Sequence, residues 1–120
     1  MLEALRSLEV WKRSCRLSVN VYKLVSTCRD YGFRDQVSRS ALSIPSNIAE
    51  GYEREGSKDR VRFLVIAKGS CGECWAQLMI GVEAGFIDKA AAATIIAELE
   101  EISRMLRGLI ASYERRDTQS

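Results

Sequence analysis

The sequence predicts an all-α protein, an antiparallel up-down-up-down four-helix bundle formed by a single domain over residues 1–120. Three observations support this fold class. Apolar residues recur at steps of three and four along most of the chain, which is the spacing of one helix face. The chain contains one proline and no alternating β-branched runs. The periodic segments are separated by short glycine- and aspartate-containing turns, which favour antiparallel neighbours.

The first helix is predicted over residues 8–29. It carries two parallel stripes at helical spacing, so its apolar face is wider than one neighbouring helix would cover. Gly32 is expected to end this helix. The stripes consist of Val10, Ser14, Leu17, Val21, Leu24 and Cys28, and of Trp11, Cys15, Ser18, Tyr22 and Val25.

The second helix is predicted over residues 35–53, with Pro45 in its interior. Proline has no amide N–H, so the carbonyl of Ala41 loses its usual partner and the ring crowds the preceding turn. A kink at Pro45 is therefore expected, without a break in the helix. The hydroxyls around the proline are expected to bond the loosened backbone groups. They belong to Ser40, Ser43 and Ser46.

The third helix is predicted over residues 58–84, with Ser57 as its N-cap. It is apolar almost all round at residues 63–67 and 75–82, which predicts the most buried helix of the bundle.

The fourth helix is predicted over residues 89–114, after a turn with Gly85 as C-cap and Asp88 as the next N-cap. The remaining residues, "RRDTQS", are expected to form a frayed tail.

Composition favours a cytoplasmic protein that is not associated with a membrane. The net charge is +2, with twelve Lys/Arg against eight Asp/Glu in residues 1–62 and six against eight thereafter. The chain lacks an uncharged apolar segment of membrane-spanning length and the pattern of a secretory signal. The four cysteines are accordingly expected to be reduced thiols.

The most distinctive chemical motif is "CGEC", which begins at Cys71 and ends at Cys74. A C-x-x-C pair can be redox-active or half of a metal site. This one falls in the middle of a predicted helix, far from the N-terminus that would activate a thiolate. Cys15 and Cys28 are too far apart on one helix to complete a zinc site, and the chain has no histidine. We therefore expect no enzyme activity, cofactor or metal. A thiol-dependent or metal-binding function of the Cys71/Cys74 pair stays open as an alternative.

A second candidate feature is a set of polar residues on the inner sides of the second and third helices. Two of them lie three residues apart on each helix, and Gly69 and Gly72 would permit close approach of the two backbones. The alternative is that the carboxylates simply face water. The hypothesis is a buried polar cluster of Asn47, Glu50, Ser70 and Glu73.

Four segments together resemble the 23S rRNA intervening-sequence proteins, which are small bacterial helical bundles. They are "LEVWKRSCRLSVNVYKLV", "QVSRSALSIPSNIAEGYER", "RFLVIAKGSCGECWAQL" and "RMLRGLI", within residues 8–112. The resemblance implies an up-down-up-down four-helix bundle that assembles as a homopentameric ring. It also implies a distant similarity to the accessory proteins of diversity-generating retroelements, which bind nucleic acid and a reverse transcriptase through a basic pentamer surface. This chain departs from them in being nearly neutral.

The expected function is a non-enzymatic, homo-oligomeric scaffold that binds protein partners. The alternative is an RNA- or DNA-binding ring, in which basic patches are repeated around the ring. Solvated charges without a partner are the third interpretation of these patches. The candidate nucleic-acid-binding residues are Lys12, Arg13, Arg16, Lys23, Arg54, Lys58, Arg60 and Arg62.

Overall fold

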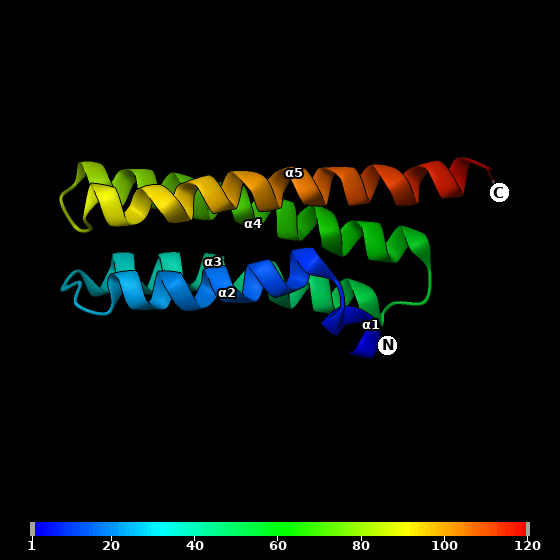
Figure 1. The fold of residues 1–120 in the computed structure, drawn as a ribbon, viewed down its shortest axis with the longest axis horizontal. Coiled ribbons are helices and arrows are strands. Elements are labelled where there is room, and N and C mark those ends of the chain that lie inside the picture. The colour runs from blue at the N-terminus through cyan, green and yellow to red at the C-terminus, as the bar shows by residue number, and fades with distance from the viewer. Residues whose placement is uncertain (1, 120) are drawn as a thin grey trace.

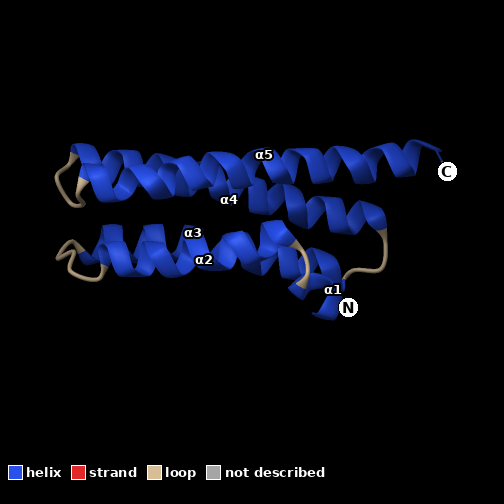
Figure 2. Ribbon diagram, viewed as in Figure 1, coloured by secondary structure: helices blue, strands red, loops and turns tan. Residues whose placement is uncertain are grey.

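The computed structural model describes residues 2–119 and contains five helices and no strand within that range. They are α1 (Leu2–Arg6), α2 (Glu9–Val25), α3 (Tyr31–Glu53), α4 (Ser57–Glu83) and α5 (Lys89–Gln119). The four long helices run antiparallel in sequence order, with α2 and α3 in one layer and α4 and α5 in the other (Figures 1 and 2). α3 packs on α4 and α2 on α5, which closes a bundle of 51 × 23 × 21 Å.

The predicted count of four helices is wrong, because residues 2–6 form a short helix of their own. α1 is separated from α2 by an extended backbone at Leu8, with φ −77° and ψ 113°. Leu5 of α1 is buried, so the apolar side of this short helix joins the core. Tertiary packing therefore holds a segment too short to be a stable helix alone.

The connection between α2 and α3 differs from the prediction. α2 ends at Val25, and α3 already begins at Tyr31, because Asp30 caps it. The Asp30 carboxylate accepts a hydrogen bond from the amide of Phe33 at 3.0 Å. Gly32 consequently lies in the first turn of α3 and does not end the preceding helix.

The turn between α4 and α5 agrees with the prediction. Gly85 has a φ of 78°, a left-handed conformation that favours glycine. The amide of Phe86 donates to the Gly81 carbonyl at 2.8 Å, which closes the end of α4. Asp88 caps α5 by accepting from the Ala91 amide at 2.9 Å.

The outer ends of α4 and α5 differ from the prediction. Ser57 is the first helical residue of α4, and the cap position before it is Gly56, which offers no side-chain hydrogen bond. α5 continues through the predicted frayed tail to Gln119.

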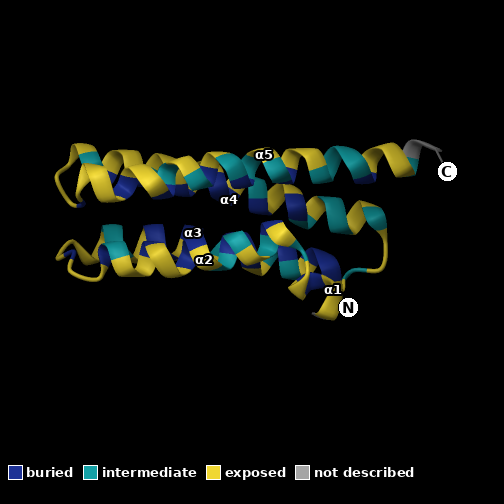
Figure 3. Cartoon of the chain, viewed as in Figure 1, coloured by how far each residue is buried: buried dark blue, intermediate teal, exposed yellow. Residues whose placement is uncertain are grey.

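The first stripe predicted for the first helix lies in the bundle core, and Figure 3 shows buried residues along the inner sides of the helices. The second stripe is only partly buried: Ser18 and Val25 lie in the core, whereas Tyr22 is half exposed. The prediction that α4 is the most buried helix is wrong, because more residues of the shorter α3 are buried. Val65, Ile66, Met79 and Ile80 are about half exposed, because the two neighbouring helices cover only part of its apolar circumference. The largest fully buried side chains are Leu17, Ile44, Ile48, Leu64, Leu78, Leu99, Ile102 and Leu106.

α3 runs through Pro45 without interruption. The Ala41 carbonyl, which cannot bond residue 45, accepts a hydrogen bond from the Ser18 hydroxyl of α2 at 2.9 Å. The serines predicted for this role have other environments. The Ser40 hydroxyl bonds the Val37 carbonyl of its own helix and the Gln77 side chain across the α3–α4 contact. Ser43 contacts the Ser70 hydroxyl, and Ser46 is exposed. The compensation thus comes from another helix, and the bend angle at Pro45 stays a prediction.

Candidate functional site

Arg13, a predicted nucleic-acid contact, joins two helices of the bundle. Its Nε donates to the Glu98 carboxylate of α5 at 2.8 Å, and Nη1 contacts the Met105 sulfur at 3.5 Å. The hydrogen bond from Arg13 lowers the pKa of Glu98, although partial burial of that carboxylate opposes the effect. The Arg13 side chain therefore links α2 to α5. Lys12 pairs with Glu9 of its own helix at 3.3 Å.

Arg60 is also a structural residue. Its guanidinium lies over the rings of Tyr52 and Tyr113, 4.6 and 5.5 Å from their centroids. It donates to the carbonyls of Gly51 and Arg54 at 3.3 and 3.1 Å. It also donates to the Tyr113 hydroxyl at 3.3 Å. Arg60 thus ties the α3–α4 connection to the far end of α5.

The two phenols beside Arg60 have opposite pKa shifts. Their oxygens are 3.1 Å apart. Burial, and then the bond to Tyr113, raises the pKa of Tyr52. Burial would also raise the pKa of Tyr113, but hydrogen bonds from Tyr52 and Arg60 outweigh it and lower the pKa of Tyr113 below its usual 10.0. Tyr113 is the phenol of this pair that ionises first.

The other basic candidates lie at both ends of the bundle. Arg54 pairs with Glu50 at 2.6 Å and stacks on Phe63, and Arg62 lies 3.8 Å from Asp59. The eight residues therefore do not form one patch. Within residues 2–119, those that are exposed without an ion pair are Arg16, Lys23 and Lys58.

The predicted polar cluster forms in part, through Ser43, which was expected to bond the backbone near Pro45 and not to join the cluster. The Ser43 hydroxyl lies 2.8 Å from that of Ser70, and the Asn47 amide donates to the Ser43 hydroxyl at 2.9 Å. Glu50 and Glu73 take no part: both are exposed, and Glu50 pairs with Arg54. The spacing of Ser43 four residues before Asn47 was the available signal for this contact.

Gly69 and Gly72, which were expected at the close contact between α3 and α4, do not lie at that contact. A Cβ at Gly69 or Gly72 would have no neighbouring atom within 4 Å. A Cβ at Gly51 would lie 3.1 Å from the Arg60 carbonyl oxygen, and one at Gly81 would collide with the Phe33 ring. Close approach of α3 and α4 therefore occurs near the two ends of α4.

All four cysteines are free thiols, and three of them are buried. Burial raises the pKa of Cys71 to about 12 and that of Cys74 to about 11, so the nucleophilic thiolate is scarce at neutral pH. Among residues 2–119, no group of three or more His, Cys, Asp or Glu side chains is placed to hold a metal ion. The pair behaves as small core hydrophobes.

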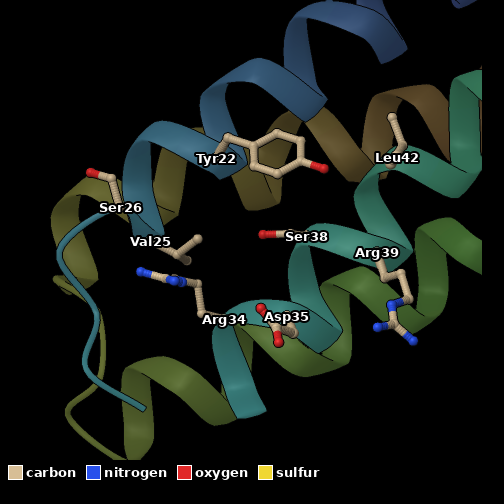
Figure 4. A pocket seen from close by; sticks show the side chains of 8 residues that line it. All are labelled: Tyr22, Val25, Ser26, Arg34, Asp35, Ser38, Arg39 and Leu42. Atoms are coloured by element: carbon tan, nitrogen blue, oxygen red, sulfur yellow. The ribbon is translucent and has the colours of Figure 1, made fainter. Parts of the chain in front are cut away.

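A groove of about 590 Å³ lies between α2 and α3, close to the loop that connects them. Figure 4 shows the Tyr22 ring extending over it toward α3, with Ser38 beneath and Arg34 and Arg39 along the α3 side. Tyr22 and Leu42 are 47% and 46% exposed, so each presents a large apolar surface to solvent.

A second, longer groove runs along the opposite layer, between α4 and α5. Two adjoining hollows of about 430 Å³ each share Glu100. Near the α4–α5 turn the groove is lined by Met79, Glu83 and two alanines of α5, Ala93 and Ala97. Farther along it is lined by Gly72, Trp75, Ser103 and Arg104.

Two stretches of the chain that contribute to these grooves differ in their charge. Residues 10–49, which form α2 and most of α3, contain seven Lys/Arg and two Asp/Glu. Residues 69–103, around the α4–α5 turn, contain one Lys/Arg and six Asp/Glu. The difference is local, because residues 9–53 of the α2–α3 layer contain seven Lys/Arg and five Asp/Glu, and residues 57–119 of the α4–α5 layer contain nine of each.

The fold and the surface define an all-α helical-bundle protein whose most distinctive features are grooves on two opposite faces. Residues 6–108 match the 23S rRNA-intervening sequence protein family, and the chain belongs to it. No helix in the described part of the chain is long and apolar enough to cross a membrane.

A solved relative has the same fold. It is a protein of unknown function from the S23 ribosomal protein family of Bacteroides thetaiotaomicron VPI-5482. It is 26% identical, with a TM-score of 0.79, over 84% of this chain and 97% of that chain. No curated protein matches the chain.

Proposed function

We propose that the protein is a non-enzymatic scaffold that acts as a homo-oligomer and binds protein partners. The observation that carries this proposal is the apolar surface left exposed by α4. Val65 and Ile80 are 52% and 62% exposed, and Ile66 and Met79 lie on the same helix. Large apolar side chains left exposed on one helix favour an interaction site, because burying apolar surface contributes roughly 25 cal/mol per Å².

The proposed assembly is a ring of five, as the family resemblance implies. Light scattering should give about five times the chain mass of 13.5 kDa. Replacing Ile66 and Ile80 by serine should lower that mass while leaving the helical content unchanged. Asn20→Ser, on an exposed polar position of α2, is the matched control. A wild-type mass of one chain would contradict the proposal.

A second candidate function is binding of RNA or DNA. It is favoured by the basic excess of residues 10–49 and by the exposure of Arg16 and Lys23. Phosphate contacts release counterions, so binding should weaken steeply with salt. Filter binding of a structured RNA at low and moderate salt is the test, with Arg16→Ala/Lys23→Ala as the binding-deficient variant. Failure to bind at low salt would end this candidate.

A further inference from the structure

The groove between α2 and α3 contains a buried hydroxyl group without a partner. Ser38 is 8% exposed, and its side chain forms no hydrogen bond with any other residue in the range 2–119. Figure 4 shows this side chain directed from α3 into the space beneath the Tyr22 ring. Most buried polar side-chain atoms in proteins have a hydrogen-bond partner. Ser38 therefore marks the groove as a place where a bound molecule can supply the missing partner.

Two arginines of α3 give the lining of this groove a positive charge. Arg34 and Arg39 both line it, and neither forms an ion pair within the described chain. Arg34 stacks on the Tyr31 ring, 4.8 Å from its centroid, which leaves its N–H groups available to a ligand. The one carboxylate in the lining belongs to Asp35. Two guanidinium groups against one carboxylate favour an anionic ligand, because guanidinium bonds phosphate and carboxylate groups strongly.

The Tyr22 ring supplies a flat apolar surface beside these polar groups. It is half exposed, and the half-exposed Leu42 continues the apolar surface on α3. An accessible aromatic ring binds a heterocyclic base by stacking, whatever the base. The groove volume of about 590 Å³ is that of a site for one small molecule, since such sites measure roughly 300–1,000 Å³. The lining therefore fits a small molecule that joins a flat ring to an anion.

We propose that the α2–α3 groove binds a mononucleotide. The base stacks on the Tyr22 ring, the phosphate accepts hydrogen bonds from Arg34, and the Ser38 hydroxyl between them bonds the sugar. Asp35 accepts a hydrogen bond from a ribose hydroxyl, and Arg39 adds positive charge at the edge of the groove. This site does not depend on the proposed scaffold function, because no residue of α4 lines the groove.

Isothermal titration calorimetry on the full chain tests the site, with AMP, GMP, CMP and UMP as probes. At least one should bind more tightly than inorganic phosphate, which lacks the ring, and than its own nucleoside, which lacks the anion. Arg34→Gln should weaken that binding about tenfold or more, because it removes hydrogen bonds to a charged group. Ser38→Ala should weaken it about fivefold. Tyr22→Leu should weaken it about fivefold or more, whereas Tyr22→Phe keeps the stacking ring and should bind as the wild type does.

Matched controls make the same changes at exposed positions outside the groove. Arg107→Gln on α5 and Ser46→Ala on α3 should leave the affinity unchanged, and circular dichroism should show the same helical content in every variant.

The inference would be overturned if none of the four mononucleotides binds, or if inorganic phosphate binds as tightly as they do. Unchanged affinity in the Arg34, Ser38 and Tyr22→Leu variants would also overturn it, because the ligand would then lie elsewhere. If no mononucleotide binds but Tyr22→Leu weakens binding of a single-stranded RNA, the groove belongs to nucleic acid and the inference is wrong. The solution mass of the wild type bears on the scaffold proposal alone, so the two proposals can fail separately.

Discussion

The hydroxyl of Ser18 donates a hydrogen bond to the carbonyl of Ala41, 2.9 Å away on the neighbouring helix. Pro45 leaves that carbonyl without its intrahelical donor, and both Ser18 and Ala41 are buried. A buried carbonyl without a partner costs about 1–3 kcal/mol. Ser18 therefore allows α3 to contain a proline at the centre of the bundle.

Ser18→Ala should lower the free energy of unfolding by about 1–3 kcal/mol, because it leaves the Ala41 carbonyl unsatisfied. In a Pro45→Ala background the loss should be smaller, since residue 45 then provides an N–H. Urea denaturation of the two single variants and the double variant, at one protein concentration, measures the coupling. Equal losses in both backgrounds would show that Ser18 does not act through that carbonyl.

Gly81→Ala should destabilise the protein by about 1–3 kcal/mol, the range for overpacking a filled site. The added methyl group would meet the Phe33 ring, which itself contacts the Phe86 ring at a centroid distance of 5.2 Å. Gly108→Ala in α5 is the control. Its Cβ meets no atom within 4 Å, so it should stabilise by about 0.5–1 kcal/mol. Thermal unfolding of both variants should show midpoint shifts of opposite sign.

The Arg13–Glu98 pair should contribute stability that depends on pH. The hydrogen bond from Arg13 lowers the pKa of Glu98 in the folded protein below its ordinary 4.5. The folded state therefore favours the ionised carboxylate, and this contribution is present above the unfolded pKa and lost as pH falls through the folded pKa. In the Glu98→Gln variant, the free energy of unfolding should fall less steeply as the pH is lowered into the acid range. Urea denaturation at a series of pH values measures this dependence. Glu53→Gln, at an exposed position, should retain the wild-type dependence.

Cys71 and Cys74 should resist alkylation in the folded protein. Burial raises both pKa values to about 12 and about 11, which lowers the thiolate population and excludes the reagent. Mass spectrometry after iodoacetamide treatment at neutral pH should show these two thiols unmodified without urea and modified with it. Rapid modification of either in the native protein would revive a thiol-dependent function.

The local sequence pattern predicted where the four long helices lie in the chain. It predicted their first and last residues less accurately. Steps of three and four place the first predicted stripe of α2 in the core, since each helix buries one face whatever its partner. Gly32 was misread because glycine alone signals an end, whereas the Asp30 cap decides that the next helix begins there. α1 was missed because five residues carry too little periodicity and depend on burial of Leu5.

The candidate site was less predictable than the fold. Spacing shows which residues share a helix face, but not which charged residue meets a partner across the bundle. Arg13 and Arg60 have the sequence signature of solvated cations, yet one binds Glu98 and the other lies between two tyrosine rings. Ser43 joins Asn47 to Ser70, while Glu50 and Glu73 point away from that contact.

The sequence by itself determined that the chain is helical, because periodicity, turn residues and the scarcity of proline act within a few residues of each other. It also determined the family. Only the tertiary structure decided how Pro45 is accommodated, which arginines are structural, and where grooves form on two opposite faces. These features depend on distances between residues far apart in the chain, such as Ser18 and Ala41, and helix packing alone sets those distances.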